Sequence, residues 1–178
     1  MDGVFPTSPP RASRSFVGRR NVLEWCRTIS HQDTRSMAIT PDDIIGTWHL
    51  VDTYTENADG SRTPNQGPSP KGILIYTADG SMAAITRSAV RDFPSTPEAN
   101  DADRARMFDT YLSYAGRWSL DGDTVTHHTE HALDENWVGT DRKRTIDHQG
   151  DRMVLKGLAG DGVSMATIVW ECAPSDGS

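Results

Sequence analysis

The sequence lacks most of the features that commit a chain to a known chemistry or to a membrane. It has two cysteines in 178 residues, Cys26 and Cys172, which are too few for a disulfide framework or a paired-cysteine metal or redox motif. No apolar run is long enough to span a bilayer. There is no glycine-rich phosphate loop before a helix and no Gly-x-Ser-x-Gly nucleophile elbow. We therefore expect a cytoplasmic protein that uses no cofactor and no metal.

Positive charge is also scarce. The net charge of -7 at pH 7 weighs against nucleic acid or an anionic membrane surface as a partner. The charge is uneven, because residues 1–36 carry a net of +3 and the remainder a net of -10. With its prolines, serines and lack of apolar periodicity, the first segment predicts a disordered N-terminal extension over residues 1–37 and one folded domain over residues 38–174. Two origins remain open for the extension: a flexible tail, or upstream sequence of a protein whose translation begins at Met37.

The chain does contain a series of glycine-bearing turn signals between short runs of β-forming residues. They are Asp59-Gly60, Asp79-Gly80, Asp121-Gly122, Gly150-Asp151 and Asp161-Gly162. Asp-Gly tolerates the positive φ of tight hairpin turns, and successive hairpins build an antiparallel meander. About eight such strands close into a barrel with room for a small ligand. The predicted fold is all-β: an eight-stranded antiparallel up-and-down barrel with one short helix.

Alternation of apolar and polar residues gives the bounds of the predicted elements. The strands are expected at about 45–55, 72–77, 82–87, 112–120, 124–131, 140–148, 152–157 and 164–171. Residues 56–70 are expected to be loop, and a helix over about 100–111 to cover one mouth of the barrel or pack on its side. In the first strand, alternation places Trp48, Leu50, Asp52 and Tyr54 on one face, which we expect to point inward.

The densest group of titratable side chains is the run Thr-His-His-Thr-Glu-His at residues 126–131. On a strand, His128 and Glu130 share one face, whereas His127 and His131 share the other. An inward-facing His128 could act as a general base oriented by Glu130. Three alternatives stay open: ligand contact without chemistry, ordinary cross-strand hydrogen bonding, and a metal site completed by a histidine from another strand. The spacing suits a metal poorly.

Aromatic and charged residues on the other strands are candidates for ligand contact. Aromatic side chains with polar tips suit flat, partly polar ligands, although they also suit an ordinary core. A buried Asp52 would need a partner, and Arg142 or Arg144 could pair with it, either for stability or to anchor a polar ligand. The candidate ligand-binding residues are Tyr54, Tyr76, Tyr114, Trp118, Arg144 and Asp52.

Several motifs in register resemble one family. Gly46-Thr47-Trp48-His49-Leu50-Val51 looks like the opening motif of lipocalin-like domains, and the run 70–80 is similar to the second-strand signature of a bacterial and fungal lipocalin-like family. The motifs at 114–118, 122–128, 136–140 and 168–170 continue the resemblance, which covers residues 44 to about 172. It implies an eight-stranded barrel with a central cavity. It also implies a structural role for Trp48, plugging the closed end against a basic side chain such as Arg144 or Arg142.

The resemblance does not imply one activity, because lipocalin-like barrels serve as carriers or as cyclases and isomerases in natural-product (secondary) metabolism. The leading expectation is a protein that binds a small apolar, aromatic or polyketide-like molecule in the barrel. The alternative is a cofactor-independent cyclase, isomerase or dehydratase, with His128 as base, Glu130 orienting it, and Tyr76 or Tyr114 as proton donor. A third hypothesis is an interaction module with a filled barrel. The sequence leaves a homodimer open.

Overall fold

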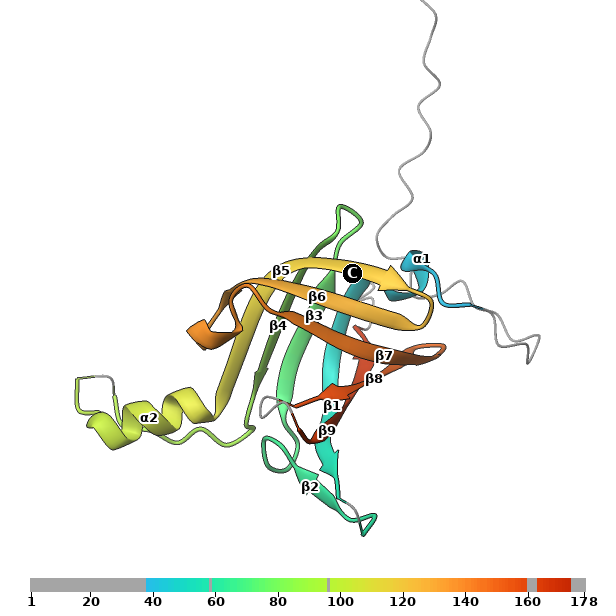
Figure 1. Ribbon diagram of the computed structural model, residues 1–178. Helices are drawn as coiled ribbons and strands as arrows, with labels where there is room; N and C mark the ends of the chain where they lie inside the picture. The colour runs from blue at the N-terminus through green and yellow to red at the C-terminus, as the bar shows by residue number, and fades with distance from the viewer. Residues whose placement is uncertain (1–37, 58, 96, 160–162, 174–178) are drawn as a thin grey trace, which may run out of the picture.

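The computed structural model describes residues 38–173 except 58, 96 and 160–162 (Figure 1). The N-terminal extension and the turn signal Asp161-Gly162 lie outside the described residues. The elements are α1 (Pro41–Ile44), β1 (Gly46–Glu56), β2 (Arg62–Pro64), β3 (Lys71–Tyr76), β4 (Ser81–Arg87), α2 (Asp101–Asp109), β5 (Tyr111–Asp121), β6 (Thr124–Ala132), the 3-10 helix η2 (Glu135–Trp137), β7 (Asp141–Gln149), β8 (Arg152–Leu158) and β9 (Met165–Cys172). Among these residues, none of the helices has the length and apolar character needed to cross a bilayer.

The strands form a closed antiparallel barrel, as predicted. They follow one another in the order β2-β1-β3-β4-β5-β6-β7-β8-β9, and β1 also pairs with β9. That last pairing closes a ring of eight strands and leaves β2 as an extra strand on β1. An eight-stranded barrel leaves an interior that side chains fill or that holds one small ligand.

Four of the predicted turns join neighbouring strands with a glycine at positive φ. The values are 81° at Gly60, 83° at Gly80, 60° at Gly122 and 68° at Gly150. The turn at Gly60 also explains the one missed strand. Residues 56–70 were expected to be loop, but the turn folds β2 back along β1, so that Glu56 pairs with Arg62.

A β-bulge in β1 reverses the direction of its later side chains. The pairing of β1 with β9 shifts between Leu50 and Asp52. Trp48 and Leu50 are buried before the bulge, and Thr53 is buried after it. The prediction that Asp52 and Tyr54 share the inward face of Trp48 is therefore wrong, because an extra residue changes the alternation.

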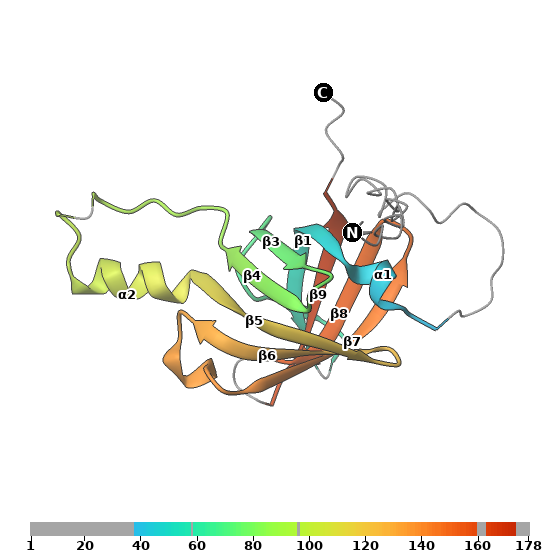
Figure 2. The same ribbon diagram turned by 90° about the horizontal axis from the view of Figure 1, so that it is seen from above.

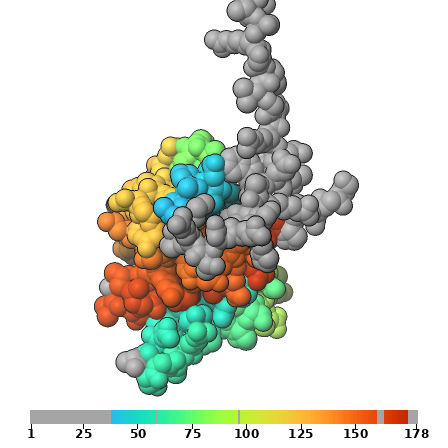
Figure 3. Space-filling view, turned by 90° about the vertical axis from the view of Figure 1, so that its right-hand side faces the viewer, coloured from blue at the N-terminus to red at the C-terminus, as the bar shows by residue number. Residues whose placement is uncertain are grey.

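The core fills the end of the barrel nearest α1. Ile44 of α1 is completely buried, and Trp48 Nε1 donates to the Ile44 carbonyl oxygen at 2.9 Å. The Trp48 ring meets the His148 ring edge-on, with centroids 5.9 Å apart. The expected cation–π contact of Trp48 with Arg142 or Arg144 is not found among the described residues: Arg142 stacks on Trp137, and the Arg144 guanidinium donates to the Lys143 carbonyl oxygen. In Figure 3, α1 (blue) lies in the upper half of the molecule and the β1–β2 hairpin at the bottom.

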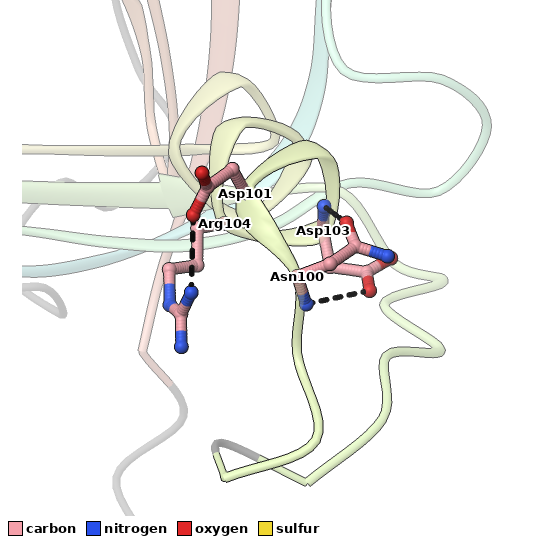
Figure 4. A network of polar contacts seen from close by, with 4 residues as sticks. All are labelled: Asn100, Asp101, Asp103 and Arg104. Carbon is pink, nitrogen blue, oxygen red and sulfur yellow. Dashed lines mark hydrogen bonds and ion pairs between the residues drawn. The ribbon is translucent and has the colours of Figure 1, made fainter.

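Helix α2 begins with a capping box (Figure 4). The Asp103 N–H donates to Asn100 Oδ1 at 3.0 Å, and the Asn100 N–H donates to Asp103 Oδ2 at 3.2 Å. None of the helix residues is buried. Figures 1 and 2 show the helix extending away from the barrel rather than packing along it. Only Phe108 and Asp109, at its C-terminal end, line the barrel cavity.

Candidate functional site

The barrel contains a cavity of about 460 Å³ in the part that the core leaves open. Its lining comes from five of the strands (β1, β4, β5, β7 and β9), the end of α2, η2 and the loops beside them. Apolar and aromatic walls are supplied by Leu112, Trp137, Ile168 and Trp170. A few polar side chains converge on the same space: Thr53, Gln66, Tyr114, Arg142 and Arg144. Small-molecule sites have this composition of apolar walls with a few placed polar groups.

His127 is the polar centre behind the cavity wall and comes from the inward face of β6. Only 1% of its surface is exposed, and Val125 and Thr129 are buried on the same face. Tyr76 Oη lies 2.6 Å from His127 Nε2, and Tyr114 Oη lies 2.8 Å from His127 Nδ1. The imidazole thus links Tyr76, in the core, to Tyr114, which lines the cavity.

All three groups are neutral at pH 7. Burial, followed by the positive charges of Arg144 and Arg142, lowers the pKa of His127 from 6.5 to about 3. Burial raises the pKa of Tyr76 and that of Tyr114. A neutral imidazole has one donor and one acceptor nitrogen, so one tyrosine donates to His127 and the other accepts from it.

The direction of this hydrogen-bond chain follows from the burial of Tyr76. Among the described residues, its hydroxyl has His127 as its only hydrogen-bond partner. If Tyr76 Oη accepted a hydrogen bond from Nε2–H, the hydroxyl hydrogen of Tyr76 would be buried without an acceptor, at a cost of about 1–3 kcal/mol. Tyr76 therefore donates to Nε2, and the Nδ1–H donates to Tyr114 Oη. The hydroxyl hydrogen of Tyr114 remains available to a ligand.

Arg142 and Arg144 place two cations on the cavity wall, from the inward face of β7. Lys143 between them is exposed. Arg144 is 7% exposed, and its Nη1 donates to the Lys143 carbonyl oxygen at 2.9 Å. The Arg142 guanidinium carbon lies 3.4 Å from the centre of the Trp137 ring, a cation–π contact. A Cβ at Gly157 would lie 2.7 Å from Arg144 Nη1, so glycine there leaves room for the guanidinium.

The predicted catalytic pair lies outside the barrel. Val125 and His127 point inward, so His128 and Glu130 occupy the outer face of β6. His128 Nε2 lies 2.9 Å from Ser119 Oγ, and His128 Nδ1 lies 2.7 Å from Asp141 Oδ1. The expectation that His128 faces a ligand, with Glu130 orienting it, is wrong, because the odd-numbered residues of β6 up to Thr129 point inward and His128 points outward.

Ser119, His128 and Asp141 are hydrogen-bonded in the same sequence as the serine, histidine and aspartate of a hydrolase triad, but they lack the surroundings of such a triad. The His128 and Asp141 side chains are 41% and 55% exposed. None of the three lines the cavity, and the backbone around them is engaged in sheet pairing between β5, β6 and β7. Free backbone N–H groups for an oxyanion hole are therefore lacking at these paired positions. The array is best explained as a surface hydrogen-bond network.

The six predicted ligand-binding residues fall into three groups. Tyr114 and Arg144 line the cavity. Tyr76 and Trp118 lie behind the lining, where their rings pack edge to face with centroids 5.4 Å apart. Tyr54 and Asp52 lie on the outer face: Tyr54 stacks under Arg62, and Asp52 accepts the Thr53 N–H instead of pairing with an arginine.

His127 and Trp137 are the site residues that sequence reasoning missed. A signal for His127 was present, because Val125 is the apolar residue of its strand and identifies the inward face two residues later. Trp137 lies in a connection, whose position against Arg142 is set by tertiary packing. Among the described residues, no cluster of three or more histidine, cysteine, aspartate or glutamate side chains is arranged to hold a metal.

Solved structures with similar folds include a lipocalin-like protein from Bacteroides uniformis, at 14% identity and a TM-score of 0.42, covering 74% of this chain and 99% of the other. An uncharacterized protein from Bacteroides eggerthii matches at 11% sequence identity and a TM-score of 0.38, over 72% of this chain and 98% of the other. The fluorescent protein UnaG matches at 12% sequence identity and a TM-score of 0.36, over 75% of this chain and 100% of the other. Similarities at this level do not transfer a ligand or an activity.

No curated protein shows significant similarity to the chain. A family model described as a lipocalin-like domain, in contrast, matches residues 45–171. That match spans the barrel from β1 to β9 and confirms the resemblance seen in the sequence motifs. The chain belongs to the lipocalin-like domain family.

Proposed function

We propose that this protein binds a small, largely apolar molecule of aromatic or polyketide-like character inside its barrel. The observation that carries this proposal is the cavity of about 460 Å³. Ligand sites of about 300–1,000 Å³ with apolar walls and few polar groups are typical of small-molecule binding. Trp137 and Trp170 offer flat apolar surfaces to such a ligand. The cavity also weighs against the hypothesis of a filled barrel that serves as an interaction module.

The alternative of a cyclase, isomerase or dehydratase finds no support in the geometry. His128 and Glu130 lie outside the barrel and cannot reach a ligand in the cavity. His127 is close to the cavity, but a base with a pKa of about 3 accepts a proton poorly at neutral pH. We therefore propose binding rather than catalysis.

The proposal can be tested by titrating the full chain with the neutral fluorescent probe N-phenyl-1-naphthylamine. Ala84 is buried and lines the cavity, whereas Ala83 faces outward on the same strand. We expect saturable binding to the wild type, loss of binding in Ala84→Phe, which fills the cavity, and retention in the matched control Ala83→Phe. Thermal unfolding would verify that both variants fold. Failure of the wild type to bind, or equal binding by Ala84→Phe, would overturn the proposal.

A further inference from the structure

Arg144 is a buried cation that faces the cavity without an anion of its own. It is 7% exposed, and the single hydrogen bond recorded for its side chain goes to the backbone carbonyl of Lys143. Among the described residues, no carboxylate oxygen lies within 4.0 Å of its guanidinium. Burying a charge without a counter-charge is unfavourable, so such a site favours a ligand that brings the missing anion.

Further hydrogen-bond donors surround the same space. Arg142 Nε and Trp170 Nε1 are buried and have no hydrogen-bond partner among the described residues. Both residues line the cavity together with Arg144. Two acids also line it, but Asp109 is exposed, and Asp134 Oδ1 caps η2 by accepting the Asn136 N–H at 3.0 Å. One buried acceptor, Gln66 Oε1, also lacks a partner among the described residues. The lining therefore offers mainly donors and positive charge.

Tyr114 adds a neutral donor with a defined direction. Because its hydroxyl oxygen accepts the His127 Nδ1–H, its own hydrogen is available to an acceptor in the cavity. Burial raises the pKa of Tyr114, which keeps this hydrogen in place at neutral pH. Tyr114 thus complements the arginines, since a carboxylate accepts hydrogen bonds from a guanidinium and a hydroxyl at the same time.

We propose that the ligand is an apolar or aromatic carboxylic acid, bound as its anion with the carboxylate held by Arg144 and Tyr114. The planar guanidinium fork matches the geometry of a carboxylate, and the aromatic walls take the apolar body of the molecule. Arg142, stacked on Trp137, contributes positive potential beside the anion. This inference rests on the proposed function, because it names the class of ligand for the same cavity.

The inference is tested with two fluorescent probes that share one apolar body, 1-pyrenebutyric acid and 1-pyrenebutanol. At neutral pH the first carries a carboxylate and the second a neutral hydroxyl. We expect the full wild-type chain to bind the acid at least about tenfold more tightly than the alcohol, since charged hydrogen bonds contribute more than neutral ones. This comparison needs no variant, so it holds even if substitutions at buried positions disturb folding.

Variants then identify the anchor. Arg144→Met should reduce the preference for the acid to less than about threefold while leaving the affinity for the alcohol nearly unchanged. Lys143→Met, which removes a charge from the exposed neighbour on the same strand, should retain the full preference. Tyr114→Phe should lower the affinity for the acid more than the affinity for the alcohol. Arg144→Lys, which keeps the charge but loses the fork, should retain part of the preference.

The outcomes separate this inference from the proposed function. If the wild type binds both probes equally, or prefers the alcohol, the carboxylate inference is overturned while the cavity function stands. If Arg144→Met folds and keeps the full preference, the anion is held elsewhere and the assignment to Arg144 is overturned. If neither pyrene probe nor N-phenyl-1-naphthylamine binds, both the inference and the proposed function fail.

Discussion

His127 determines the chemistry of the cavity wall by staying neutral between two tyrosines. Its pKa of about 3 in the folded protein lies below the ordinary value of 6.5, with burial as the main cause. The unfolded chain therefore binds more protons at this residue between those two pH values. The stability that comes from a neutral His127 is complete above about pH 6.5 and is lost as the pH falls toward 3.

We predict that the ring signals of His127, followed by NMR, do not titrate between pH 7.5 and pH 4.5. In the same interval His127 should add up to about 1.4 kcal/mol per pH unit to the loss of unfolding free energy. His148 contributes in the same direction, because burial also lowers its pKa. A comparison with His127→Gln isolates the effect, since that variant should lose stability less steeply in acid. A titration midpoint near pH 6 for His127 would contradict the assignment.

The neighbouring His128 should behave as an exposed surface residue. We predict that His128→Gln leaves the affinity for N-phenyl-1-naphthylamine within about twofold and changes stability by less than about 1 kcal/mol, as is usual for exposed polar pairs. Its hydrogen bonds to Ser119 and Asp141 lie on the outer face of the barrel. Fluorescence titration with the probe would measure the affinity, and urea unfolding would measure the stability. A large loss of affinity would mean that His128 communicates with the cavity after all.

At the scale of elements, the bounds of the eight barrel strands could be predicted to within about one residue, because turns and alternation are local, whereas the short strand β2 was missed. The direction of side chains could not be predicted everywhere. In β1 the bulge after Leu50 reverses the alternation, and nothing in the sequence of that strand announces an extra residue. In β6 the buried Val125 indicates that His127, two residues later, points inward. The prediction instead rested on the number of titratable residues in the strand and chose His128 and Glu130.

A second bulge explains the glycine in β5. The β5–β6 register passes from Ala115 opposite His131 to Gly116 opposite Thr129, which leaves Glu130 without an opposite residue. A Cβ on Gly116 would lie 2.0 Å from the His128 carbonyl oxygen. Such a contact cannot be relieved by a side-chain rotation, because the obstacle is backbone.

We predict that Gly116→Ala lowers the free energy of unfolding by roughly 1–3 kcal/mol or more, as overpacking does. Gly122→Asn is the matched control: its φ of 60° is one that asparagine tolerates, and no heavy atom lies within 4 Å of an added Cβ. Chemical denaturation of both variants would give the comparison. Equal stability of Gly116→Ala and the wild type would show that the bulge relaxes at little cost.

At the scale of the whole molecule, the barrel is packed at the α1 end and hollow around Tyr114, Trp137 and the two inward arginines. The sequence predicted an eight-stranded barrel and placed Tyr114 and Arg144 among the ligand contacts. It could not show which half of the interior stays open, because that depends on α1, η2 and the two bulges together. A cytoplasmic location and the disordered extension over residues 1–37 stay predictions.

Native mass spectrometry of the full chain purified from its producing cells tests the central claim most directly. If the barrel is a binding site, part of the protein should carry a co-purifying small molecule that is released on denaturation and is absent from Ala84→Phe. Detection in negative-ion mode after release would then identify its acidic group. A chain that is bare in the native spectrum and also fails to bind the apolar fluorescent probe would contradict the account.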